Sequence, residues 1–148
     1  MSKDEQIVMT ELKDDEFTRA FESCTLPNAE FHHADHVRMA FLYLCRFSPL
    51  EALQRFSRSL MNFAIANGKP GLYHETITWA FLLLIRERMV RFSVRNGTSP
   101  SWDDFARDNP DLLTWKDSIL KRYYTEETLS SELARKTFVF PDRLQDRG

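Results

Sequence analysis

The chain has little of several residue types on which common catalytic and binding motifs depend. Its 148 residues include four glycines, two cysteines and four histidines. No Gly-rich phosphate loop and no Ser or Cys nucleophile motif occurs, which argues against nucleotide-driven and triad chemistry. Cys24 and Cys45 are too few for a disulfide framework, and neither has a second cysteine at metal-ligand spacing. We therefore expect two reduced thiols.

Charge and hydropathy argue against two further classes of partner. The 20 Lys and Arg residues are balanced by 22 Asp and Glu, a formal charge of −2, whereas a nucleic-acid binder carries a basic excess. The longest apolar run, residues 79–85, has seven residues, and a membrane span needs about 20. The stretch Met1–Gln6 carries no secretory signal. These features predict a cytoplasmic protein with neither nucleic-acid nor membrane partners.

The chain does contain enough apolar material for a folded core. Hydrophobic residues make up 43% of it, and twelve Phe and three Trp must mostly be buried. A chain of this length fits one domain. We predict a single helical domain over residues 1–148, with residues 1–11 and 142–148 loosely ordered.

Apolar residues recur at the three- and four-residue steps of amphipathic helices through most of the chain. We predict an all-α, single-domain bundle with three long helices at about 34–47, 49–67 and 73–95, followed by shorter C-terminal helices. Pro49 fits the first turn of the second helix, and the Asn-Gly-Lys-Pro-Gly stretch at 67–71 ends it.

The same periodicity predicts how these helices pack. Leu50 is expected in the core, and the 73–95 helix, apolar on every side in its first half, is expected to be enclosed. A further helix is predicted after Pro110, with Trp115 packing inward. The apolar tail at 137–141 is expected to lie extended across the bundle.

All four histidines fall in two short motifs, Phe-His-His-Ala-Asp-His at residues 31–36 and Tyr-His-Glu-Thr at residues 73–76. Histidine changes charge near neutral pH and is the commonest metal ligand. Each motif lies in the first turn of a predicted long helix, and in an up-down-up bundle those two helices start at the same end. We therefore expect the motifs to converge on one polar site.

In the leading hypothesis this site binds a divalent transition metal. The predicted ligands are His33, His36 and His74, with help from His32 or Glu75. His33 and His36 lie three residues apart and share a helical face. Three protein ligands plus a water form the open coordination of a catalytic metal, for which zinc, nickel and iron are equally compatible. Such a metal would act on a small-molecule ligand.

Two alternatives need no metal, and whether the chain is an enzyme stays open between them. In the first, His36 and His74 act as general base and acid. Asp35 or Glu75, the catalytic candidates, then fix their tautomers. The substrate-binding candidates are the polar side chains beside the motifs: Arg38, Tyr43, Tyr73 and Thr78. In the second, the histidines are structural helix caps and ties within a non-enzymatic interaction protein.

Three aromatic residues and one basic stripe outside the histidine motifs are expected to have structural roles. Three aromatic residues are candidates for a homodimer contact, although burial is their default: Trp102, Phe105 and Trp115. Arg88, Arg91 and Arg95 form a basic stripe near the end of the 73–95 helix. Cations are favoured at a helix C-terminus, so we expect a solvated face.

The paired motifs, FHHADHVR at residues 31–38 and YHETIT at residues 73–78, resemble a signature of small bacterial all-helical proteins that have no established activity. The resemblance covers residues 31–81 and implies a stand-alone bundle. The histidines are also similar to the ligand set of the DinB-like metal-binding four-helix bundles, which use three histidines, two of them four apart. Here His32 and His36 precede His74, whereas in that class the spaced pair comes last.

Overall fold

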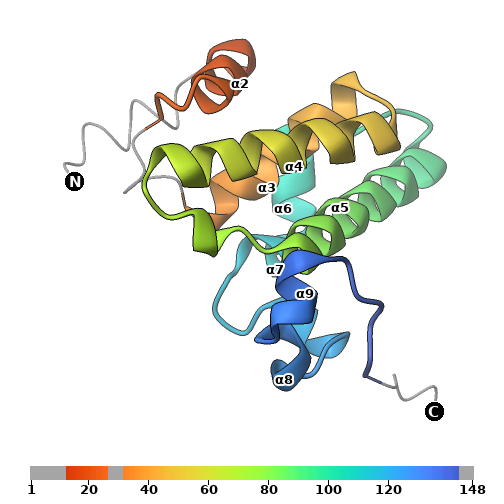
Figure 1. Cartoon of the computed structure of the whole chain (residues 1–148). Coiled ribbons are helices and arrows are strands. Elements are labelled where there is room, and N and C mark those ends of the chain that lie inside the picture. The colour runs from red at the N-terminus through yellow and green to blue at the C-terminus, as the bar shows by residue number, and fades with distance from the viewer. Residues whose placement is uncertain (1–12, 27–31, 144–148) are drawn as a thin grey trace. The chain divides into compact units, whose positions relative to one another are not determined.

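The computed structural model describes residues 13–26 and 32–143, and these ranges are all-α (Figure 1). Within them lie eight α-helices and two short 3-10 helices, without a strand. The all-α prediction is confirmed. No helix in the described ranges is both long and apolar enough to cross a membrane. Contacts group the chain into two compact parts, Met1–Leu72 and Tyr73–Gly148.

In its described residues the first part contains α2 (Asp14–Glu22), α3 (His33–Arg46), α4 (Pro49–Ala66) and the 3-10 turn η2 (Pro70–Leu72). The helices predicted at 34–47 and 49–67 correspond to α3 and α4, and α4 runs back along α3 (Figure 1). Pro49 is the first residue of α4, where its missing N–H costs no hydrogen bond.

An aromatic cluster holds α2, α3 and α4 together. The ring of Phe21 lies 5.7 Å from that of Phe63 and 6.1 Å from that of Phe56. Tyr43 meets Phe56 edge-on at 5.9 Å, and such buried aromatic rings dominate core packing. Leu50 is 81% exposed, so the prediction that it lies in the core is wrong. Its position, six residues before Phe56, is about 120° away around the helix.

The second part begins with α5 (Glu75–Asn96), the helix predicted at 73–95. It ends at Gly97, whose φ of +74° is the left-handed cap conformation that favours glycine. Five short helical segments follow in the described residues: α6 (Trp102–Asp108), α7 (Pro110–Leu113), η3 (Ile119–Arg122), α8 (Glu126–Leu129) and α9 (Glu132–Lys136). Of these, α9 packs against α5.

Helix α5 is buried along one face and not all round. Leu82 and Ile85 are fully buried, whereas Leu83, which lies in the half predicted to be enclosed, is 44% exposed. Successive residues point about 100° apart on a helix, so Leu83 lies on a different face from Leu82. The prediction of an enclosed helix is therefore wrong along this stripe, because hydrophobicity alone does not state how many faces the fold covers.

The segment after Pro110 is not the single helix that was predicted. Helix α7 ends at Leu113, and Asp117 adopts a left-handed φ of +55°, which a continuing α-helix cannot contain. Ile119 remains buried beyond this turn, but Trp115 is 54% exposed. The inward orientation predicted for Trp115 is wrong because the chain changes direction between the two buried residues Leu112 and Ile119.

Candidate functional site

The first histidine motif lies at the start of α3, where the Asp35 carboxylate bonds to the backbone of His32. Asp35 Oδ2 accepts a hydrogen bond from the backbone N–H of His32 at 3.1 Å. The Asp35 N–H donates in turn to the His32 carbonyl at 2.9 Å. Burial raises the pKa of Asp35, and the hydrogen bond from His32 opposes that shift. The catalytic candidate Asp35 is thus engaged as a helix cap.

His36 carries a neutral imidazole. Burial, followed by the charges of His33 and His32, lowers its pKa from 6.5 to about 4. The charges of His33 and His32 thus act on His36 in the same direction as its burial. Within the described residues, no group of three His, Cys, Asp or Glu side chains is arranged to hold a metal ion. A metal at this turn would need a donor from elsewhere.

The lowered pKa of His36 predicts a loss of stability in mild acid. As the pH falls from 6.5 to about 4, the unfolded chain takes up a proton at His36 before the folded chain does. We expect the free energy of unfolding to fall over this window by up to about 3 kcal/mol. Urea unfolding at a series of pH values measures it. His36→Gln should flatten the curve; an unchanged curve in that variant would contradict the assignment.

Arg38 and Tyr43, two substrate-binding candidates, connect helices in the first part. Arg38 donates to Asp14 Oδ1 at 3.0 Å, and its guanidinium lies 4.4 Å from the ring centre of Phe17. The Tyr43 hydroxyl donates to Glu22 at 2.7 Å, and burial raises the pKa of this phenol. Asp14, Phe17 and Glu22 all belong to α2. Both candidates therefore fix α2 against α3.

The second motif belongs to the other compact part of the chain. His32, His33 and His36 lie within Met1–Leu72, and His74 lies within Tyr73–Gly148. The convergence of the two motifs on one site therefore stays a prediction.

Both ring nitrogens of His74 are hydrogen-bonded to backbone. Nδ1 accepts from the Ile77 N–H at 3.1 Å, which caps the start of α5. Nε2 lies 2.7 Å from the carbonyl oxygen of Leu129. A carbonyl only accepts, so Nε2 carries the proton and the ring is the neutral Nε2–H tautomer. His74 is 9% exposed and joins the start of α5 to the end of α8.

Glu75 and Tyr73 are bonded to each other and to a residue that sequence reasoning missed. Glu75 Oε1 accepts from the Tyr73 hydroxyl and from Trp79 Nε1–H, the latter at 3.1 Å. Trp79 lies four residues after Glu75, a spacing that predicts contact on a helix. The Thr78 hydroxyl donates to the His74 carbonyl at 2.8 Å, a bond within the preceding turn rather than to the ring.

Thr76 completes the motif and holds the C-terminal segment. Its side chain is fully buried; the hydroxyl donates to the Thr137 carbonyl at 2.8 Å and accepts from the Val139 N–H at 3.1 Å. The Tyr124 hydroxyl donates to the Val139 carbonyl at 2.7 Å. Thr76 was not among the predicted site residues, and nothing in the sequence indicates a partner 61 residues away.

The described C-terminal segment continues in a fixed path to its last residues. The Asp142 carboxylate accepts from the backbone N–H of Thr125 at 2.9 Å and from the hydroxyls of Thr125 and Thr128. The Arg143 N–H donates to the Tyr123 carbonyl at 3.0 Å. Residues 142–148 were predicted to be loosely ordered, but Asp142 and Arg143 are hydrogen-bonded to the chain. The rest of that predicted end, residues 144–148, and the predicted loose N-terminal residues 1–11 lie outside the described ranges.

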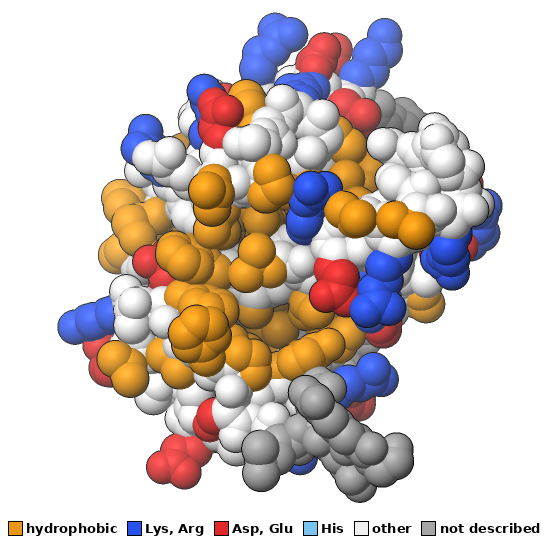
Figure 2. Space-filling view, turned by 90° about the vertical axis from the view of Figure 1, so that its right-hand side faces the viewer, with side chains coloured by type: hydrophobic (Ala, Val, Ile, Leu, Met, Phe, Trp, Pro, Cys, Tyr) orange, Lys and Arg blue, Asp and Glu red, His pale blue; other side chains and the backbone are white. Residues whose placement is uncertain are grey.

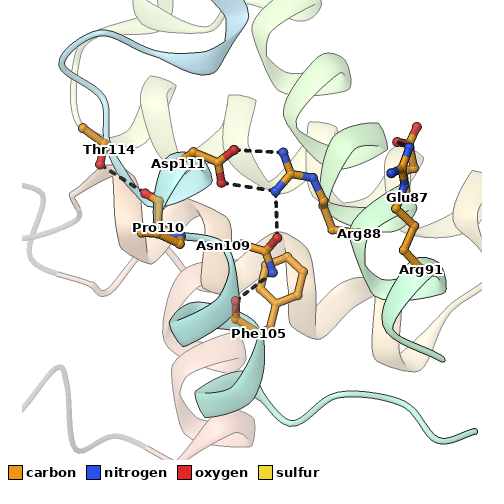
Figure 3. Close-up of polar contacts among 8 residues, drawn as sticks. All are labelled: Glu87, Arg88, Arg91, Phe105, Asn109, Pro110, Asp111 and Thr114. Atoms are coloured by element: carbon orange, nitrogen blue, oxygen red, sulfur yellow. Dashed lines mark hydrogen bonds and ion pairs between the residues drawn. The ribbon is translucent and has the colours of Figure 1, made fainter. Parts of the chain in front are cut away.

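A second polar cluster involves the basic stripe of α5 (Figure 3). Arg88 forms a fork with Asp111, with N–O distances of 2.9 and 3.2 Å, and donates to Asn109 Oδ1 at 2.8 Å. Asn109 donates to the Phe105 carbonyl at 2.9 Å. The bond with Arg88 lowers the pKa of Asp111. Arg88 is therefore not the solvated residue that was predicted; it ties α5 to the start of α7. Phe105, a predicted dimer candidate, is 1% exposed.

Arg88→Met is expected to lower the free energy of unfolding by about 1–3 kcal/mol, because Asp111 and Asn109 lose their shared donor. Chemical unfolding at neutral pH measures this. Arg91→Met is the matched control, since Arg91 is exposed and, among the described residues, forms its ion pair along α5 with Glu87; it should cost under about 0.5 kcal/mol. Equal effects of the two variants would contradict the structural role of Arg88.

Comparison of the chain with protein-family models, with curated proteins and with solved structures finds no match.

Proposed function

We propose that this protein is a non-enzymatic interaction protein in which the histidine motifs stabilise the fold and partner binding takes place on apolar surface. One observation carries the proposal: both nitrogens of the His74 ring are already bonded to backbone, to Ile77 on one side and Leu129 on the other. A metal ligand or a general base needs a nitrogen lone pair that faces its ion or substrate. In His74 the only lone pair is aimed at a helix-start N–H.

Recruiting His74 to a metal would carry a cost. It would leave either the Ile77 N–H or the Leu129 carbonyl without its partner, at about 1–3 kcal/mol for each buried group. The neighbouring motif residues are engaged in the same way, Glu75 by Tyr73 and Trp79, and Thr76 by the C-terminal segment. These hydrogen bonds favour a structural role for the motif, in which it connects the start of α5 to the C-terminal part of the chain.

Exposed apolar side chains supply the surface that an interaction protein needs. Figure 2 shows hydrophobic side chains gathered on the face that it draws. The large apolar residues with the greatest exposure include members of both parts: Leu50, Ile65 and Leu72 in the first, and Val94, Leu133 and Phe140 in the second. Apolar side chains that lie together on the surface of either part are typical of protein–protein interaction sites.

The histidine tautomer tests the proposal. In tag-free protein at a pH of about 7.5, long-range ¹⁵N correlation spectra are expected to report the neutral Nε2–H form of His74. Excess Zn²⁺ should leave its Nδ1 and Nε2 resonances unchanged. A zinc-induced shift of these resonances, together with zinc uptake that His74→Ala abolishes, would contradict the proposal.

A metal site that takes ligands from the start of α3 and a further donor from elsewhere is the second candidate. It is favoured by the closeness of His33 and His32 to His36, whose pKa their charges lower, because neighbouring imidazoles can share a metal ion. Zinc uptake that is lost in a His33→Ala/His36→Ala variant, with the His74 resonances unmoved, would support this candidate. Absence of uptake by the wild-type protein would remove it.

A further inference from the structure

Within Tyr73–Gly148, one row of side chains places a carboxylate at the head of an apolar surface. Glu75, Trp79 and Leu83 follow one another on successive turns of α5. The C-terminal segment adds the ring of Phe138, which stacks on Trp79, and the ring of Phe140, which contacts Phe138. We name these five residues the acid–aromatic patch. It combines residues that lie about 60 positions apart in the sequence.

The aromatic rings of the patch are in contact and reach the surface. Trp79 stacks on Phe138 with ring centres 5.5 Å apart and an interplanar angle of 18°. Phe138 meets Phe140 at 5.6 Å and 77°, an edge-on contact. Phe140 is 79% exposed and Leu83 is 44% exposed. The C-terminal segment runs along the right-hand side of Figure 1, the side on which Figure 2 shows hydrophobic side chains gathering.

The Glu75 carboxylate lies at the end of this row, where it accepts hydrogen bonds from neutral groups. Its Oε1 atom accepts from two neutral donors, the Tyr73 hydroxyl and the Trp79 indole. No Lys, Arg or His of the described ranges forms an ion pair with Glu75. The patch therefore combines one carboxylate with the half-buried indole of Trp79, to which it is bonded, and with the exposed ring of Phe140.

We propose that the acid–aromatic patch binds an arginine side chain that a partner protein presents between apolar residues. The proposal rests on the interaction function proposed above and names the chemistry of the partner. The guanidinium pairs with the Glu75 carboxylate and lies against the exposed aromatic rings. The apolar neighbours of that arginine then cover Leu83 and Phe140, the two exposed apolar members of the patch.

Charge complementarity selects this occupant over others. A phosphate or carboxylate would be repelled by Glu75. A purely apolar segment would cover the Glu75 charge without supplying a counterion, which is costly. Arginine suits the patch better than lysine because its planar, weakly hydrated guanidinium stacks on aromatic faces and pairs with a carboxylate through two parallel hydrogen bonds.

The experiment titrates the ¹⁵N-labelled full chain with the peptide acetyl-Leu-Arg-Phe-Leu-amide and follows the indole N–H resonance of Trp79. Trp79→Phe assigns that resonance among the three tryptophans. We expect the resonance to shift on binding, because the indole N–H is bonded to Glu75. Replacing the peptide's arginine by citrulline, a neutral isostere, should weaken binding about tenfold. Glu75→Gln should weaken it by a similar factor while keeping an oxygen that accepts from Tyr73 and Trp79.

Glu127→Gln is the matched control, since it removes one negative charge from exposed α8 and should leave the affinity unchanged. Three outcomes would overturn the proposal: no shift at millimolar peptide, equal binding of the citrulline peptide, or unchanged affinity in Glu75→Gln. None of these alters the expected His74 tautomer, so they refute the patch alone. Zinc binding at His74 would instead refute the interaction function.

Discussion

His74→Ala is expected to lower the free energy of unfolding by about 2–4 kcal/mol in the absence of any metal. The substitution removes the N-terminal cap of α5 and leaves the Leu129 carbonyl without its donor. Loss of a helix cap costs about 1 kcal/mol, and an unsatisfied buried acceptor costs about 1–3 kcal/mol. Urea unfolding, followed by circular dichroism with chelator present throughout, measures the change.

His74→Asn separates the two contributions. An asparagine oxygen can accept from the Ile77 N–H as a helix cap, but its side chain is too short to reach the Leu129 carbonyl. We therefore expect His74→Asn to recover about 1 kcal/mol relative to His74→Ala. If His74→Ala unfolds at the same urea concentration as the wild-type protein, His74 is not a structural tie, and the proposed function loses the observation that carries it.

Thr76→Val is expected to lower the free energy of unfolding by about 2–3 kcal/mol and to loosen the C-terminal segment. Valine fills nearly the same volume but lacks the hydroxyl that donates to Thr137 and accepts from Val139. The Val139 N–H would then lose its only protein acceptor among the described contacts. Hydrogen exchange at the Val139 amide measures the release directly, and it should accelerate in the variant.

Thr78→Val provides the matched control two residues away. Thr78 is also buried, but its hydroxyl bonds only to the carbonyl of His74 in the preceding turn, which already accepts the Thr78 backbone N–H. We expect Thr78→Val to cost less than about 1 kcal/mol. Equal losses from Thr76→Val and Thr78→Val, or unchanged exchange at Val139, would show that the bonds to the C-terminal segment contribute nothing specific.

The Tyr-His-Glu-Thr motif connects the start of α5 to the C-terminal part of the chain through hydrogen bonds. His74 bonds to α8 through Leu129, and Thr76 bonds to Thr137 and Val139. Glu75 accepts hydrogen bonds from the side chains of Tyr73 and Trp79. Hydrogen bonds thus account for four consecutive polar or aromatic residues at a helix start, and both donors to Glu75 are neutral groups.

The long helices were predictable because the signals that set them are local. The 3.6-residue spacing of apolar residues, Pro49 at the start of α4 and Gly97 after α5 act through neighbours in sequence. Predictions of burial from the same pattern were wrong at residues whose burial depends on segments distant in the sequence. Leu50 and Trp115 are hydrophobic, yet they are 81% and 54% exposed, although Trp115 contacts the ring of Phe81 on one side. Hydrophobicity states that a residue is stable when buried, and not that the fold buries it.

The sequence by itself determined that the chain is helical, where its long helices begin and end, and that its histidines stand at two helix starts. Only the tertiary structure decided what those side chains do, because the partners of His74 and Thr76 are backbone groups 55 and 61 residues away. Backbone carbonyls and N–H groups are the same at every position, so no residue letter identifies Leu129 or Thr137 as a partner. The role of a polar side chain is fixed by which of these identical groups the fold brings within hydrogen-bonding distance.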